Sequence, residues 1–314
     1  MPEFLTGTTG AWIGLAVAIA VLLVLDLAVL RGRGGEMTTR QAAITSVVWV
    51  GISLIFGVVL LLLGTSEQAE SYLAGYIVEK SLSLDNVFVF LVVFNAFAIA
   101  EQRRARLLTY GILLALVLRL GFILAGAAAL ERASWLSFPF AVLLAWTGWR
   151  LWKGRHDHGG EEKLVFGVRR HLKVAEGDHG ERLTTRVGGR RALTAAGATL
   201  VAIAVVDIIF AVDSVPAIFA ITQDPFIVYT SNIFAILGLR ALYFALAAII
   251  DRFAYLKYAL AGILVFVGGK IIAAEALGKL PAWISLTVTA ALLMAGIIYS
   301  LYRTRTTVRQ TVNC

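Results

Sequence analysis

Two stretches of the chain place carboxylates within otherwise apolar sequence. Each holds two acids six residues apart with a small polar residue directly after the second acid: Glu79, Asp85 and Asn86 in the first, and Asp207, Asp213 and Ser214 in the second. Carboxylate, amide and hydroxyl oxygens suit magnesium, calcium and manganese, whereas copper and zinc favour histidine and cysteine. The apolar segments contain neither histidine nor cysteine. The pattern therefore predicts a pathway or site for a hard or borderline divalent cation.

Helical geometry indicates which of these groups share a face. Residues seven apart on an α-helix differ by only about 20°, so Glu79 aligns with Asn86, and Asp207 with Ser214. Residues six apart differ by about 120° and lie roughly 9 Å apart along the axis, so the two acids of each stretch occupy adjoining faces. Pro216 adds a further oxygen, because proline cannot donate to the carbonyl four residues earlier. A free carbonyl is tolerated at membrane depth where it lines a cavity.

Ionisable side chains inside apolar segments are costly and usually mark a pathway or a site. Away from the segment ends, the acids are Asp26, Glu79, Asp85, Asp207 and Asp213, and the bases are Lys80, Arg119 and Arg240. Five acids less three bases leave two negative charges, which one divalent cation would neutralise. Protonation of buried acids would also lower this charge. The negative surplus argues against an oxyanion substrate.

An alternative role for these charges is to pair with one another as links between helices. For the arginines we favour this role, with Arg119 paired to Asp85 and Arg240 paired to Asp213. For the acids we favour the cation pathway, because links between helices would need neither the surplus of carboxylates nor the neighbouring polar groups.

Two further charged residues have roles that the sequence leaves open. Asp26 lies nearer the end of its apolar segment, and it suits a pairing role as well as a pathway role. Lys80 could pair with its neighbour Glu79, or it could move during a transport cycle.

The composition of the chain indicates what kind of structural elements carry these charged residues. The chain of 314 residues is 59% hydrophobic and 15% charged, which excludes an ordinary soluble domain and a disordered chain. Apolar stretches long enough to cross a bilayer as helices start near residues 11, 42, 72, 107, 133, 194, 225, 255 and 282. We therefore predict an all-α polytopic membrane protein of about nine spans, with residues 1–314 forming a single transmembrane domain.

Lysine and arginine in the connections predict the orientation, because cytoplasmic loops carry the excess of these residues. Basic residues follow spans 1, 3, 5 and 9, which places the N-terminus outside and the C-terminus in the cytoplasm, in the cytoplasmic (inner) membrane. The net charge of +8 is spread over these connections, so it does not indicate nucleic-acid binding.

One long polar segment, residues 154–191, is predicted to be a cytoplasmic loop. It contains all four histidines: His156, His158, His171 and His179. The His156-Asp-His158 run could collect a metal ion, but no second cluster completes a ligand set, so we expect a solvated charged loop. The single cysteine, Cys314, allows no internal disulfide.

Spans 3–5 and spans 6–8 resemble each other in sequence. Besides the paired acids, the segment from Gly111 to Arg119 resembles the segment from Asn232 to Arg240. Because each unit has three spans, the second copy must cross the membrane in the opposite sense. Inverted repeats of this kind are typical of secondary transporters, whose sites lie near the midplane where the repeats meet.

Several of these segments resemble the TerC family of integral membrane proteins, and especially its Alx-type bacterial members. The resemblance runs over nearly the whole chain and rests on long motifs: EKSLSLDNVFVF from Glu79, FAVDSVPAIFA from Phe210, TSNIFAILGLRALYF from Thr230 and LKYALA from Leu256. Alx-type members are associated with manganese export from the cytoplasm. The resemblance therefore implies that Glu79, Asp85 and Asp213 are ion ligands, with Asn86 and Ser214 beside them.

The sequence thus predicts a transporter, not an enzyme. We expect export of Mn²⁺ by alternating access, with protons returning on the same carboxylates and with Ca²⁺ or other divalent cations as competing substrates. A non-transporting membrane scaffold or insertion factor is the main alternative. An intramembrane aspartyl protease is a weaker one, because the chain lacks the Gly-x-Gly-Asp motif.

Overall fold

The computed structural model describes residues 8–31, 38–153, 159–246, parts of 258–269, and 282–312, with single-residue or two-residue gaps between 173 and 188. Some side chains within these ranges are not described, including those of Asp85 and Asp213. The helices are α1 (Thr9–Arg31), α2 (Thr39–Leu63), α3 (Ser66–Ala96), α4 (Glu101–Arg132), α5 (Ser137–Lys153), α6 (Gly159–His171), α7 (Ala195–Phe219), α8 (Pro225–Ile236), α9 (Leu239–Leu246) and α11 (Ala282–Val312). A short 3₁₀ turn, Ser134–Leu136, precedes α5.

The chain is an all-α polytopic membrane protein, as predicted. Helices begin within a few residues of the expected starts of spans 1, 2, 4, 5, 6, 7 and 9, and α3 covers span 3 from Ser66 onward. Within the described part, five segments are long and apolar enough to cross a membrane: Thr9–Asp26, Thr39–Leu63, Glu101–Arg132, Ala195–Phe219 and Pro225–Ala245. The span predicted near residue 255 lies largely outside the described residues.

The outer helices expose large apolar side chains, as expected for a protein surrounded by lipid. On α2, Val47, Ile55 and Leu62 are 70%, 65% and 75% exposed. A soluble protein would hide a surface of this extent. The pattern indicates that α2 presents one face to acyl chains.

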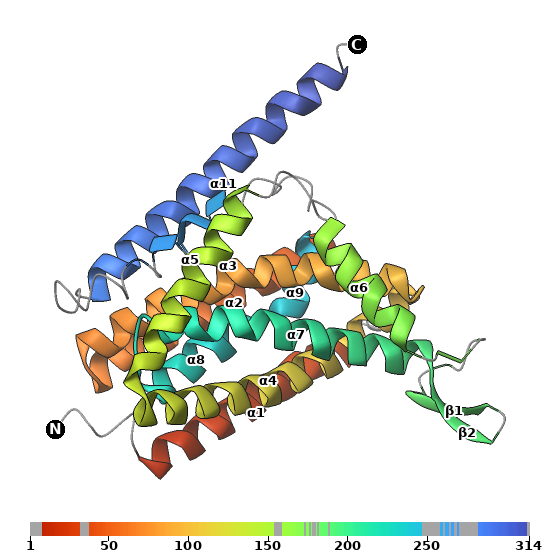
Figure 1. The fold of residues 1–314 in the computed structure, drawn as a ribbon, viewed down its shortest axis with the longest axis horizontal. Helices are drawn as coiled ribbons and strands as arrows, with labels where there is room; N and C mark the ends of the chain where they lie inside the picture. Colours follow the sequence, from red (N-terminus) through yellow and green to blue (C-terminus); the bar gives the residue numbers. More distant parts are fainter. Residues whose placement is uncertain are drawn as a thin grey trace.

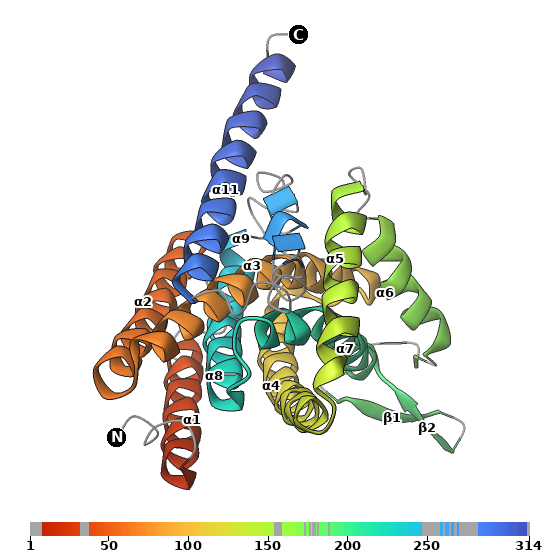
Figure 2. The ribbon, with the colours of Figure 1, turned by 60° about the vertical axis from the view of Figure 1, so that its left-hand side comes forward.

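Helix α3 is the central element of the bundle. It packs against α2, α7, α8 and α11, and α4 packs against α7 and α8. Figures 1 and 2 show α11 running along the bundle at its beginning and then extending away from it toward the C-terminus. Aromatic side chains fill the contact between α2, α3 and α8: the rings of Phe56 and Phe234 stack at 4.5 Å, and the Tyr72 hydroxyl donates to the Ser53 carbonyl at 3.0 Å. This packing holds α8 beside α3.

Span 7 is broken into two helices, α8 and α9, where the sequence predicted one span. Gly238 at the break has a φ of +82°, which favours glycine because it has no Cβ. A Cβ there would also lie 2.5 Å from Cγ of Trp49. Two backbone carbonyls at the end of α8 accept hydrogen bonds from side chains. Ser53 Oγ donates to the Phe234 carbonyl at 3.4 Å, and Lys80 Nζ donates to the Ala235 carbonyl at 3.1 Å. Lys80 therefore supports the break.

The segment predicted as a cytoplasmic loop, 154–191, contains a helix and two strands that the sequence analysis did not predict. Helix α6 buries Val165 against the bundle, with Val168 and Leu172 packed beside it. Strands β1 (Thr184–Val187) and β2 (Arg190–Leu193) form an antiparallel hairpin that projects beyond the start of α7 (Figure 1). Three of the four histidines, His156, His158 and His179, lie outside the described residues. His171 ends α6, where its side chain is exposed.

Candidate functional site

Arg119 is the centre of a buried polar cluster between α3, α4 and α7. Its side chain is 1% exposed, and Nη1 forms a hydrogen-bonded ion pair with Glu79 Oε1. Nη2 lies 3.3 Å from Asp207 Oδ1. One guanidinium thus contacts a carboxylate from each of the two acidic stretches that the sequence singled out.

Two neutral side chains complete the surroundings of the guanidinium. Arg119 Nη1 donates to Asn232 Oδ1 at 3.1 Å and to Ser214 Oγ at 3.4 Å. Asn232 lies on α8, one turn before that helix ends at Ile236, and Ser214 lies on α7, seven residues after Asp207. Four helices therefore converge on this group of five residues, which we call the Arg119 cluster: Glu79, Arg119, Asp207, Ser214 and Asn232.

The Arg119 cluster carries more negative than positive charge. Two carboxylates oppose one guanidinium, which leaves one negative charge if both acids are ionised. Glu79 Oε2 and Asp207 Oδ2 are buried, and no described group donates a hydrogen bond to either. Buried charges are normally paired and hydrogen-bonded, because removal from water is otherwise costly. The two free oxygens can accept a proton or a cation.

The cluster lies at the middle of a helix that is long and apolar enough to cross a membrane. Asp207 is twelve residues from each end of α7, which spans Ala195–Phe219. At a rise of 1.5 Å per residue it is about 18 Å from either end, and a hydrocarbon core is about 30 Å thick. Asp207 is therefore as far from both ends of α7 as the length of that helix allows.

Arg240 belongs to a second ion pair. Its Nη2 lies 2.8 Å from Asp26 Oδ2 and also donates to the Asp26 carbonyl at 3.1 Å, while Nη1 donates to Thr109 Oγ1 at 3.2 Å. These contacts join α1, α4 and α9. Asp26 is 18% exposed at its side chain, so this pair is less enclosed than the Arg119 cluster. Of the two roles left open for Asp26, pairing is the one that the geometry shows.

Both arginines form ion pairs with acids in the described part of the chain, and their pairing with Asp85 and Asp213 stays a prediction. The sequence predicted Asp85 for Arg119 and Asp213 for Arg240, whereas the described contacts are to Glu79 with Asp207 and to Asp26. The side chains of Asp85 and Asp213 lie outside the described part, so their predicted ion-ligand roles stay predictions. Their helical positions place both acids two turns or less from the Arg119 cluster.

Other predicted residues lie near the cluster without joining it. Asn86 is buried on α3, and Lys80 contacts the Ala235 carbonyl instead of the adjacent Glu79. Ser83 Oγ donates to the Glu79 carbonyl at 2.8 Å. Pro216 lies inside α7, which continues past it to Phe219.

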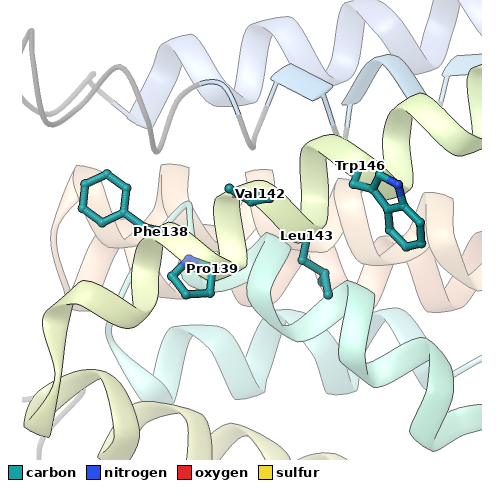
Figure 3. Close-up of a pocket in the computed structure, with 5 residues that line it drawn as sticks. All are labelled: Phe138, Pro139, Val142, Leu143 and Trp146. Atoms are coloured by element: carbon teal, nitrogen blue, oxygen red, sulfur yellow. The ribbon is translucent and has the colours of Figure 1, made fainter.

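No set of three or more His, Cys, Asp or Glu side chains that could hold a metal ion occurs among the described residues. In the arrangement seen here, Arg119 occupies the position between the two described carboxylates. A hollow on α5 offers no alternative cation site, because its lining is apolar (Figure 3). It consists of Phe138, Pro139, Val142, Leu143 and Trp146.

Comparison with known proteins places these features in a family. A model described as the integral membrane protein TerC family matches residues 64–308. Alx of Escherichia coli (strain K12), described as a candidate membrane-bound redox modulator, is 41% identical over 304 residues, covering 93% of this chain and 94% of its own. The membrane protein STKORF319 of Myxococcus xanthus is 40% identical over 301 residues, covering 95% and 94%. No solved structure matches the chain.

Proposed function

We propose that this chain, which belongs to the TerC family of integral membrane proteins, exports Mn²⁺ from the cytoplasm by alternating access. The observation that carries the proposal is the Arg119 cluster: carboxylates from two helices, one of them at the middle of α7, share one guanidinium and retain two free oxygens. The choice of manganese comes from the family resemblance and from the oxygen chemistry of the acids.

In this proposal Arg119 acts as an internal cation that competes with the substrate. A divalent ion that binds the free oxygens of Glu79 and Asp207 lies beside the guanidinium that the same two carboxylates hold, so the two positive groups repel each other strongly in a medium of low dielectric. Binding of Mn²⁺ would displace Arg119, and the return of Arg119 would help to expel the ion on the far side. Asp85 and Asp213 would supply further oxygens to the ion.

The broken helix supports a transporter over a rigid scaffold. Discontinuous helices near the midplane are a recurring feature of transporter sites. Asn232 lies on α8, one turn before that helix ends at Ile236, and it contacts Arg119 directly. A change in the angle between α8 and α9 would therefore alter the surroundings of Arg119.

The name of the relative Alx points to a redox role. Within these 314 residues Cys314 is the one cysteine, so an internal dithiol cannot form among them. We propose that a redox effect would arise through the manganese that the protein moves instead of through thiol exchange.

The test is Mn²⁺ flux into sealed liposomes that contain the purified full chain and a manganese-sensitive dye. We expect Mn²⁺ flux above that of protein-free liposomes, and an equal concentration of Ca²⁺ should reduce this flux by less than half. Absence of Mn²⁺ flux in well-folded, correctly inserted preparations would refute transport and favour the scaffold alternative. A scaffold would also tolerate Asp85→Asn and Asp213→Asn, whereas a transporter would lose flux.

Proton return on the carboxylates is a separate part of the proposal. An imposed pH gradient, acidic on the side toward which Mn²⁺ would move, should raise the initial rate of flux. An unchanged rate would remove proton coupling and leave cation transport intact.

A further inference from the structure

The β1–β2 hairpin carries a basic hollow that transport does not use. The hollow has a volume of about 560 Å³ and is lined by Arg182, Thr184, Thr185, Arg186 and Arg191. All three arginine side chains are exposed. Guanidinium forks and hydroxyl donors together form a suitable environment for phosphate oxygens.

The strand register brings two of the arginines directly opposite each other. Arg186 pairs with Arg191 across the hairpin, and Thr184 lies two residues before Arg186 on the same face. Like charges in opposing positions destabilise a strand pair. No carboxylate in the described part of the chain forms an ion pair with these arginines. The arrangement therefore favours an external anion that bridges the two guanidinium groups.

The hairpin is fixed to the bundle. The Thr194 amide donates to the Leu183 carbonyl at 3.1 Å, and the Ala175 amide donates to the Leu193 carbonyl at 2.8 Å. The first turn of α7 approaches the hairpin so closely that a Cβ at Gly197 would lie 1.9 Å from the Leu183 carbonyl oxygen. The basic hollow is thus held in a set position relative to α7.

This position is at the surface of the membrane. Arg191 is four residues before Ala195, the first residue of the membrane-spanning helix α7, so at most about 13 Å of chain separates them. Arg103, in the first turn of α4, donates to the Gly180 carbonyl at 3.3 Å, so α4 and α7 begin at the same end of the bundle. Figure 1 shows the hairpin projecting beyond the start of α7.

The apolar side chains of the hairpin also suit a lipid surface. Leu183 and Val187 are 41% and 54% exposed, although neither lies within a membrane-spanning helix. They alternate along the chain with Arg182, Thr184 and Arg186. A segment with exposed apolar and basic residues at the end of a spanning helix is typical of contact with the headgroup layer.

We propose that the hairpin binds the phosphate of an anionic phospholipid headgroup at the membrane surface, in the hollow between Arg182, Arg186 and Arg191. The chemistry would also accept free phosphate, but the position beside the start of α7 favours lipid. The arginines would hold the phosphate, the Thr184 hydroxyl on the same face would donate to it, and Leu183 and Val187 would enter the boundary of the acyl chains. This site is independent of cation transport.

The experiment titrates the detergent-solubilised full chain with short-chain phosphatidylglycerol and measures bound lipid by native mass spectrometry. Each basic residue near a membrane surface contributes about 1 kcal/mol, which is about fivefold in affinity. The triple variant Arg182→Gln, Arg186→Gln and Arg191→Gln should therefore lose about a hundredfold. Lysine at the same three positions should keep most of the affinity, because the charge remains.

A second triple variant controls for net charge. Arg40→Gln, Arg132→Gln and Arg170→Gln remove the same charge from exposed positions elsewhere and should leave binding unchanged. Equal losses in both glutamine variants, or no loss in the hairpin variant, would overturn the proposal. Displacement of the lipid by equimolar inorganic phosphate would also overturn it, because free phosphate would then be the preferred ligand.

Discussion

Replacement of Arg119 by leucine tests whether the Arg119 cluster is held together by charge. The guanidinium is buried and contacts Glu79, Asp207, Ser214 and Asn232. Without it, one further carboxylate must either stay charged in a buried position or take up a proton. Proton uptake sets the upper limit of the stability that the variant loses, because protonating an ordinary carboxylic acid at pH 7 costs about 4 kcal/mol. That value agrees with the roughly 3–5 kcal/mol lost when a buried ion pair loses one partner.

The same reasoning predicts the sign of the pH dependence. Acid supplies the proton that the leucine variant needs, so the loss of stability should shrink by about 1.4 kcal/mol for each unit by which the pH falls. The free energy of unfolding in mixed micelles, measured by denaturing-detergent titration with circular dichroism, should therefore show a loss of about 4 kcal/mol at pH 7 and about 1 kcal/mol at pH 5.

Two matched variants make this result specific. The double variant Arg119→Leu with Asp207→Asn removes one charge of each sign and should recover part of the lost stability. Arg132→Leu, at the exposed end of α4, should change little. A leucine variant at position 119 that is as stable as the wild type at pH 7, or equally impaired at pH 5 and pH 7, would refute the electrostatic account.

Two further predictions concern the break in span 7 and the second ion pair. Gly238→Ala should destabilise the fold by about 2 kcal/mol or more in the same unfolding assay, because φ is +82° and the new Cβ would overlap Trp49. The control Gly121→Ala, at a position with open space around it, should not destabilise the fold. Asp26→Asn should lower the free energy of unfolding by about 1.5 kcal/mol, which is less than the loss for Arg119→Leu, because Arg240 keeps the Asp26 carbonyl and Thr109 as partners. A loss equal to or larger than that of Arg119→Leu would contradict this ranking.

Length and hydropathy were sufficient to locate the long apolar helices of the described part, because a bilayer demands long apolar segments of a narrow length range. They were not sufficient to locate the break at Gly238. A glycine is compatible with a continuous membrane helix, and the break depends on contacts with Trp49, Ser53 and Lys80 from other helices. Those contacts are tertiary, so periodicity along α8 and α9 does not reveal them.

The acids and their polar neighbours could be identified from spacing, but spacing does not indicate that Arg119 contacts Glu79 and Asp207. The rotation of α3, α4 and α7 about their axes determines which acid meets Arg119. Helices that are apolar on nearly all sides carry no strong amphipathic signal for that rotation. The hairpin, in contrast, had a readable signal: two glycines, Gly188 and Gly189, separate two short stretches that contain threonine and valine or leucine.

The most direct test of the central claim compares the initial rate of Mn²⁺ flux in liposomes for the wild type, Glu79→Gln and Asp207→Asn, with Glu131→Gln as a control at the exposed end of α4. Both cluster variants keep the size of the side chain and remove the charge that the ion would bind. The account predicts that flux falls at least tenfold in both cluster variants while the control matches the wild type. Full flux in Glu79→Gln and Asp207→Asn, with wild-type protein active, would show that manganese does not pass through the Arg119 cluster.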